Sequence, residues 1–240
     1  MAAKKFRRPP TAQEAVLAEL RGWIATGRLQ PGEQLVQDTL ALELGVSRVP
    51  LREALKILEG EGQVSYVAHR GYFVTELSLA DLLEVYRIRE LLEAEAVRRA
   101  VPLMTTEDVE RFEEAAADVR RAAGTVDVPA MSTSNRRFHF ALISACAMPR
   151  LIRVLHVLWD STEVYRSVYF TDDANKDRVL AEHDELVAAV RAGDADAALA
   201  VLSRHRQNAI AALRPLLEQS GVDWRSSSLS GDLDRIEALD

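Results

Sequence analysis

Hydrophobic residues form helical patterns along two short segments that a glycine separates, and in the second segment they recur at steps of three and four. The first segment, residues 37–44, is rich in leucine, and Gly45 permits the turn that ends it. Along residues 48–60 the apolar positions share one side of a predicted helix and the basic positions share another. The apolar positions are Leu51, Ala54, Leu55 and Leu58, and the basic positions are Arg48, Arg52 and Lys56. Two short helices in this order, the second capped by Ser47, predict a helix-turn-helix with a cationic face.

The flanks of this pair complete a small module. A helix is expected over residues 11–26, where Val16, Leu17, Leu20 and Ile24 form an apolar stripe. Residues 64–67 and 72–75 are rich in β-branched and aromatic side chains and enclose a basic turn, which predicts a hairpin suited to phosphate or minor-groove contact. A basic amphipathic helix alone is often an ordinary solvated helix. The complete order of elements favours a winged helix-turn-helix instead.

The remainder of the chain shows successive helical patterns and predicts no strand. Breaks near residues 102–106, 124–128, 148–149, 171–175 and 193 predict six helices, with Thr106 and Asp194 as N-caps. The expected fold class is therefore mainly α, with an all-α helical bundle after the winged domain. The domains are expected to be a flexible basic arm at residues 1–10, the winged helix-turn-helix at 11–77, the helical bundle at 78–220 and a polar tail at 221–240.

Charge and cysteine content narrow the class of protein. The 240 residues carry a formal net charge of −7, but the first 77 contain ten basic and nine acidic side chains, so the acidity lies in the helical part. The single Cys146 excludes an intramolecular disulfide and suits a reducing cytoplasm. The basic N-terminus is followed by no apolar run, which argues against a secretory signal or membrane span. No phosphate-binding glycine loop or nucleophile elbow supports hydrolytic chemistry.

Histidines supply the candidate chemistry of the helical part. His139, His183 and His205 fall on three separate predicted helices, and Asn135 precedes His139 by one helical turn, so an amide oxygen and an imidazole can reach one ion. Imidazole-rich coordination suits zinc, nickel, iron or another first-row divalent metal. An isolated helical histidine is more often a surface or hydrogen-bonded core residue, and His156 is expected to be one.

The N-terminal part resembles the GntR family of bacterial transcription regulators. The resemblance rests on GRLQPGEQL at residues 27–35, LALELGVSRVPLREALKILEGEG at residues 40–62 and HRGYFV at residues 69–74. Carried over position by position, it implies that DNA is contacted by Ser47, Arg48, Arg52, His69, Arg70 and Gly71. Val49 stands where a threonine is usual in the family, which removes a hydroxyl that could meet a phosphate.

The helical part is similar to the all-helical ligand-binding (FCD) domain of the FadR-type subfamily. The similarity lies in NRRFHFALISACAMPRL at residues 135–151, EHDELVAAVRAGDADAA at residues 182–198 and SRH at residues 203–205. It implies a divalent transition metal, zinc or nickel, held by Asn135, His139, His183 and His205. It also implies effector contact by Arg89, for which pairing with Glu93 is the competing interpretation. In CAMPR, Ala147 and Met148 replace the family's usual Gly-Asn.

These features together predict a cytoplasmic, homodimeric repressor that binds a near-palindromic operator in double-stranded DNA and senses a small carboxylate through a metal centre. A neutral asparagine ligand leaves the full charge of the metal available to an anion. No membrane association and no catalysis are expected. Two alternatives stay open: a regulator with a purely structural metal and no effector, and a metal-dependent enzyme with Glu182 or Asp184 as general base.

Overall fold

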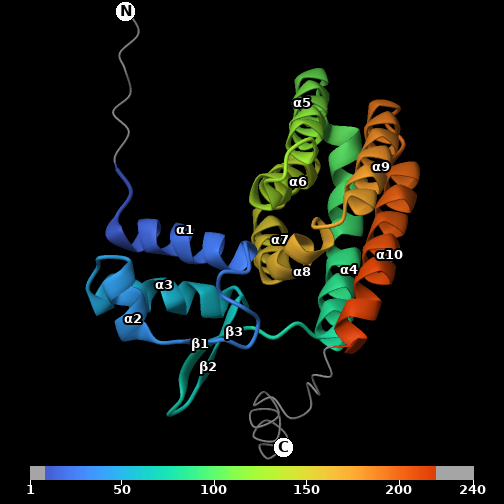
Figure 1. Ribbon diagram of the computed structural model, residues 1–240. Helices are drawn as coiled ribbons and strands as arrows, with labels where there is room; N and C mark the ends of the chain where they lie inside the picture. The colour runs from blue at the N-terminus through green and yellow to red at the C-terminus, as the bar shows by residue number, and fades with distance from the viewer. Residues whose placement is uncertain (1–8, 220–240) are drawn as a thin grey trace, which may run out of the picture. The chain divides into compact units, whose positions relative to one another are not determined.

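The computed structural model describes residues 9–219, and the chain divides into two compact units between Thr75 and Glu76 (Figure 1). The predicted arm at residues 1–10 lies outside the described residues except for its last two, and the predicted tail at residues 221–240 lies wholly outside them.

Within its described residues, 9–75, the first unit contains three helices, α1 (Ala12–Ala25), α2 (Gln37–Glu43) and α3 (Arg48–Gly60). Thr11 caps α1 in a capping box with Glu14, which fixes where that helix begins. The apolar stripe predicted for α3 is buried, because Leu51, Leu55 and Leu58 are inaccessible to solvent. These side chains pack with the apolar face of α1, so the basic face of α3 is left on the surface.

A three-stranded antiparallel sheet completes the first unit. The predicted hairpin is confirmed as β2 (Val64–Val67) and β3 (Gly71–Val74), with Val64 opposite Val74 and Val67 opposite Gly71. A third strand that the sequence pattern did not reveal, β1 (Gln34–Leu35), pairs with β3 and gives the order β1-β3-β2. In Figure 1 the β2–β3 ribbon projects from the helices of this unit as a wing.

The second unit is helical throughout its described part, as expected. Its helices are α4 (Leu79–Leu103), α5 (Thr106–Ala123), α6 (Val128–Ile143), α7 (Pro149–Ser161), α8 (Glu163–Tyr169), α9 (Asp173–Arg191) and α10 (Ala195–Gln219), with the short 3₁₀ helix η1 (Ser144–Cys146) between α6 and α7. The long helices α4, α9 and α10 lie side by side (Figure 1). Asp194 caps α10 by accepting from Ala197 N at 2.9 Å, as predicted.

Two details of this unit differ from the sequence prediction. Seven α-helices stand within residues 79–219 rather than six, because the segment after Pro149 breaks at Thr162. The Thr162 hydroxyl donates to the carbonyl oxygens of Leu158 and Trp159 and so competes with continued helix. The cap of α5 is Thr105 rather than Thr106, since Thr105 exchanges hydrogen bonds with Asp108.

The core of the second unit surrounds the middle of α6. Phe138 stacks on Phe112 of α5 with ring centroids 4.4 Å apart, and Met131, Trp159 and Tyr165 are also fully buried. Such dense packing holds the α6 side chains in single rotamers. No helix within residues 9–219 is long and apolar enough to cross a bilayer.

Candidate DNA-reading surface and metal centre

The N-terminal end of α3 is an exposed, basic part of the first unit. Ser47, Arg48 and Arg52 are all exposed, on the side of α3 opposite its buried leucines. Ser47 occupies the N-cap position, but within residues 9–219 its hydroxyl makes no capping hydrogen bond. It is thus a donor that a phosphate can use, next to the positive end of the helix dipole.

Two neighbours modify this basic surface. Arg48 forms an ion pair with Asp38 of α2, in which both side chains are largely exposed. An exposed pair of this kind is weak, so a phosphate or a base edge can replace the carboxylate. Val49 is 60% exposed, so the apolar side chain that departs from the family pattern faces solvent beside Arg48.

The tip of the wing has the backbone that a tight basic turn requires. His69 and Gly71 have φ values of 64° and 93°, in the left-handed region that glycine adopts freely and histidine only at some cost. Arg70 between them is exposed, and its guanidinium lies 5.1 Å from the centroid of the Phe73 ring. Stacking on Phe73 restricts the arginine and keeps its charge at the end of the hairpin.

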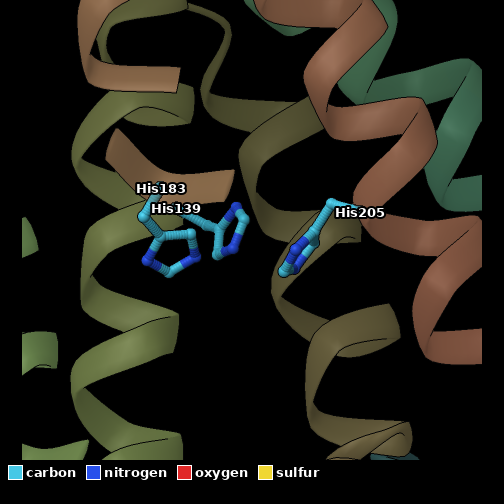
Figure 2. A group of neighbouring side chains, drawn as sticks. All are labelled: His139, His183 and His205. Carbon is cyan, nitrogen blue, oxygen red and sulfur yellow. The ribbon is translucent and has the colours of Figure 1, made fainter. Parts of the chain in front are cut away.

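The three histidines singled out from the sequence come together in the second unit. His139 of α6, His183 of α9 and His205 of α10 each offer a ring nitrogen, and these three nitrogens lie within 4.8 Å of one another. Figure 2 shows the three rings gathered between their helices. His139 and His183 are buried and His205 is nearly so, which makes this an interior cluster rather than a surface one.

Several polar atoms of this cluster have no hydrogen-bond partner in the described part of the chain. They are Asn135 Oδ1, His139 Nε2 and both ring nitrogens of His183. Unsatisfied buried atoms cost free energy, and native proteins rarely leave several of them together. An amide oxygen and imidazole nitrogens around one point are the ligands of a first-row divalent cation, so these residues fit such an ion.

Protonation also favours metal binding. Burial lowers the pKa of His139 well below its ordinary value of 6.5, and the imidazoles of His183 and His205 lower it further. Burial and His205 likewise lower the pKa of His183. Both rings are therefore neutral at pH 7 and have a free lone pair to donate.

Glu182 orients the third imidazole. Its carboxylate lies 2.6 Å from His205 Nδ1 and also accepts a hydrogen bond from Asn208. Burial alone would raise the pKa of Glu182, but the interactions of the carboxylate with His205, Asn208 and Arg204 together outweigh burial and leave that pKa below its ordinary value. A carboxylate accepts only, so Nδ1 carries the proton and Nε2 is the donor atom for a metal. Asp184 does not join the site, because it pairs with Arg120 on the surface.

Arg89 lies in a buried ionic network beside the cluster. Its Nε and Nη2 both lie 3.0 Å from Glu93 Oε1, so the sequence interpretation of Arg89 as a partner of Glu93 describes a real pair. Glu93 also accepts from Trp159 Nε1 at 2.9 Å and from Arg206 Nη1 at 2.7 Å. Sequence reasoning missed the roles of Trp159 and Arg206, because nothing in their spacing links them to Glu93.

A small cavity of about 30 Å³ connects this network to the histidine cluster. Its lining includes Arg89, Arg166 and Arg206 together with Asn135 and His205. A larger hollow of about 450 Å³ lies elsewhere, between α5, α6 and α7, and is lined by residues such as Arg136 and His156. His156 stacks on Phe140 there with ring centroids 4.0 Å apart, away from the other three histidines.

The turn after α6 keeps a shape that its sequence does not favour. Ala147, in the CAMPR segment, has a φ of 56°, which is the left-handed conformation that the family's usual glycine adopts without cost. The replacement of glycine by Ala147 therefore introduces backbone strain without removing the turn.

Comparisons with known proteins cover both units. Residues 12–74 match the family described as bacterial regulatory proteins, gntR family, and residues 84–208 match the FCD domain. The HTH-type transcriptional regulator McbR of Escherichia coli (strain K12) is 30% identical over 199 residues, which are 81% of this chain and 89% of McbR. The uncharacterized HTH-type transcriptional regulator BphR of Paraburkholderia xenovorans (strain LB400) is 31% identical over 211 residues, 84% of each chain.

Comparison with solved structures also finds similarity to a regulator of this kind. The structure described as E. coli McbR/YncC superposes with a TM-score of 0.74 at 27% sequence identity, covering 88% of this chain and 99% of that one. The relatives and the similar structure are transcription regulators rather than enzymes.

Proposed function

Because the chain belongs to the GntR family of DNA-binding transcription regulators and carries an FCD domain, we propose that it is a repressor controlled by a small carboxylate bound at a metal centre. The observation that carries the proposal is the buried cluster of unpartnered imidazole and amide atoms next to a cavity lined by arginines, within the described residues. A metal would bind the unpartnered imidazole and amide atoms, and an anion would pair with the arginines of the cavity.

Asn135, His139, His183 and His205 would hold the metal, which we assign to zinc or nickel on the nature of the ligands. All four are neutral, so the site keeps the full double charge of the ion. The bound ion would supply a positive charge and open coordination positions to a carboxylate. The role of Arg89, at the wall of the same cavity, would be to attract that carboxylate.

DNA recognition is assigned to Ser47, Arg48, Arg52 and the wing residues His69, Arg70 and Gly71. The arginines of α3 would read base edges in the major groove, and the wing tip would contact the backbone or minor groove. We propose that a homodimer brings two such surfaces to a near-palindromic operator. The partly exposed apolar side chains of Leu91 on α4 and Val154 on α7 are compatible with an interface between copies.

A hydrogen-bonded link supports communication between the effector cavity and the start of the helical unit. Tyr165 of α8 accepts from Ser78 N at 2.9 Å, and its hydroxyl lies 3.0 Å from Ser78 O and 2.9 Å from Asp81 Oδ2. Ser78 is the N-cap of α4 and follows the first unit by only three residues of chain. A shift of α8 on effector binding would therefore alter the first turn of α4, which leads to the wing.

A thermal-shift series tests the proposal. Protein stripped of metal should melt at a lower temperature than nickel- or zinc-loaded protein, and small carboxylates should raise the melting temperature only when metal is present. His183→Ala should abolish both shifts. The matched change His156→Ala, outside the cluster, should preserve them. DNA fragments selected by binding to the metal-loaded protein should then be released when the stabilising carboxylate is added.

One observation favours a second candidate, a regulator with a structural metal and no effector. The cavity beside the histidines has a volume of about 30 Å³, close to the space that one water molecule occupies in the liquid. In that case metal would raise the melting temperature and no carboxylate would raise it further, while DNA binding would persist. That outcome would remove the effector from the proposal.

A further inference from the structure

The cavity beside the histidine cluster is lined by three guanidinium groups and, in the described part of the chain, by no acidic side chain. Arg89 of α4, Arg166 of α8 and Arg206 of α10 are each more than nine-tenths buried. Buried arginines are stable only when they are paired, so the partners of each one determine which is available to a ligand.

Arg89 and Arg206 are committed to the same carboxylate. Glu93 accepts from Arg89 Nε and Arg206 Nη1 as well as from Trp159 Nε1, and it is itself almost inaccessible to solvent. Removing either arginine from this arrangement would leave buried charge on Glu93 without full compensation. A ligand that binds these two residues therefore has to do so without breaking their bonds to Glu93.

Arg166 is held differently. It donates through Nη1 to Thr162 Oγ1 at 2.7 Å and through Nη2 to Trp159 O at 2.6 Å and to Glu163. Its Nε is buried and has no partner within residues 9–219. Glu163 is more exposed than Glu93, with 20% of its side chain accessible, and Ser132 Oγ also donates to it at 2.6 Å. If Arg166 turns to a ligand, Glu163 can therefore keep the hydrogen bond from Ser132 and accept another from water.

The position of Arg166 suits a ligand that also reaches the metal centre. Both lie close to the Trp159 ring, whose centroid is 4.8 Å from the Arg166 guanidinium and 4.9 Å from the centroid of the His139 ring. Tyr169, one turn beyond Arg166 on α8, lines the same cavity, and its buried hydroxyl makes no hydrogen bond of regular geometry in the described chain, although the side chain of Arg178 interacts with it. A guanidinium Nε and a phenol on one helical face form a pair of donors for an anionic group.

We propose that Arg166 and Tyr169 bind a second acid group of the effector, which is therefore a short dicarboxylate with its first carboxylate at the metal. This inference rests on the proposed metal centre and specifies the class of ligand. Arg166 leaves Glu163 to take the ligand, whereas Arg89 stays with Glu93 and contributes its charge to the field of the site. The small volume of the cavity means that side chains of α8 move when the ligand enters.

Matched acids test the proposal by titration calorimetry on the nickel-loaded full chain. Malonate, succinate and glutarate are compared with propionate, butyrate and valerate, which have the same chain lengths and one carboxylate fewer. At least one dicarboxylate should bind about tenfold or more tightly than its monocarboxylate, because the latter cannot form the charge-assisted pair with Arg166. Arg166→Gln should remove this preference and leave monocarboxylate affinity and nickel content unchanged.

A second variant separates ligand binding from structural damage. Glu163→Gln keeps the shape of the side chain but releases Arg166 from its charged partner, so it should tighten dicarboxylate binding severalfold. Arg136→Gln, a control at the larger hollow where Arg136 pairs with Asp160, should change neither class of acid. Weaker dicarboxylate binding in Glu163→Gln, or an intact preference in Arg166→Gln, would overturn the assignment. If no acid binds wild-type protein that is loaded with nickel, the proposed effector function itself fails.

Discussion

Replacing Glu93 should lower the stability of the helical unit far more than replacing an exposed glutamate does. Glu93 is buried on α4, accepts hydrogen bonds from one nitrogen each of Arg89, Trp159 and Arg206, and forms an ion pair with a second nitrogen of Arg89. The change Glu93→Gln keeps the volume of the side chain but removes the negative charge that both arginines share. It also places an amide N–H group opposite donors that then lack an acceptor.

The cost should be about 3–5 kcal/mol, because removing one partner of a buried ion pair leaves the other charge uncompensated. The control is Glu95→Gln, two residues along the same helix, where the carboxylate is 48% exposed and pairs with Arg99 at 2.7 Å. An exposed pair at this spacing contributes about 0.3–0.5 kcal/mol. The two substitutions are chemically identical, so their difference isolates the effect of burial.

Guanidinium denaturation followed by circular dichroism at 222 nm measures both variants, with metal removed so that ion binding does not contribute. The pH dependence gives a second test. Burial would raise the pKa of Glu93, but Arg89 and Arg206 outweigh it and hold that pKa below its ordinary value of 4.5. The contribution of the carboxylate is therefore complete above pH 4.5 and is lost as the pH falls through the lowered pKa, so the gap between wild type and Glu93→Gln should narrow there. Equal losses in Glu93→Gln and Glu95→Gln at pH 7 would refute the reasoning.

Three further changes test other parts of the molecule. Arg52→Ala should weaken binding to selected DNA by about 1–3 kcal/mol for each base that the arginine reads, measured by fluorescence anisotropy, and unchanged affinity would contradict its assignment. Ala147→Gly should raise the free energy of unfolding by up to about 1 kcal/mol, since relief of the left-handed strain exceeds the added entropy of the unfolded chain. Tyr165→Phe should bind effector and DNA separately as wild type does, but effector should no longer change its DNA affinity.

Much of the fold follows from local patterns. Residues close together in the sequence determine three of its features: the apolar stripe of α3, the hairpin and the Asp194 cap. Periodicity and capping rules therefore predict these features. The break at Thr162 and the two-residue strand β1 escaped prediction. A threonine hydroxyl interrupts a helix only if its bonds to the preceding carbonyls prevail, and a strand as short as β1 is defined by its partner rather than by its own sequence.

Part of the candidate site could likewise be predicted from the sequence, and part could not. The i, i+4 spacing of Asn135 and His139 indicated a shared face, His183 and His205 stood out as histidines on two other predicted helices, and the family resemblance implied that all four form one ligand set. The structure places the three imidazoles together, whereas metal binding itself is a proposal. The ionic network could not be predicted, because Glu93, Trp159 and Arg206 belong to three helices far apart in sequence. Only the pair of Arg89 with Glu93 is local enough for helical spacing to suggest it.

The distribution of charge explains why this interior suits an anion. The chain carries a net charge of −7, and all of that excess lies outside the first unit, yet the cavity in the helical unit is lined by arginines and, among the described residues, by no acid. Buried positive charge destabilises a fold unless something compensates it, and a divalent ion held by neutral ligands would add two more positive charges. A bound dicarboxylate would offset that charge, so the metal-loaded protein should gain more stability from the acid than the metal-free protein does. The same electrostatic cost that makes the unliganded interior unfavourable would then provide the free energy that links effector binding to DNA affinity.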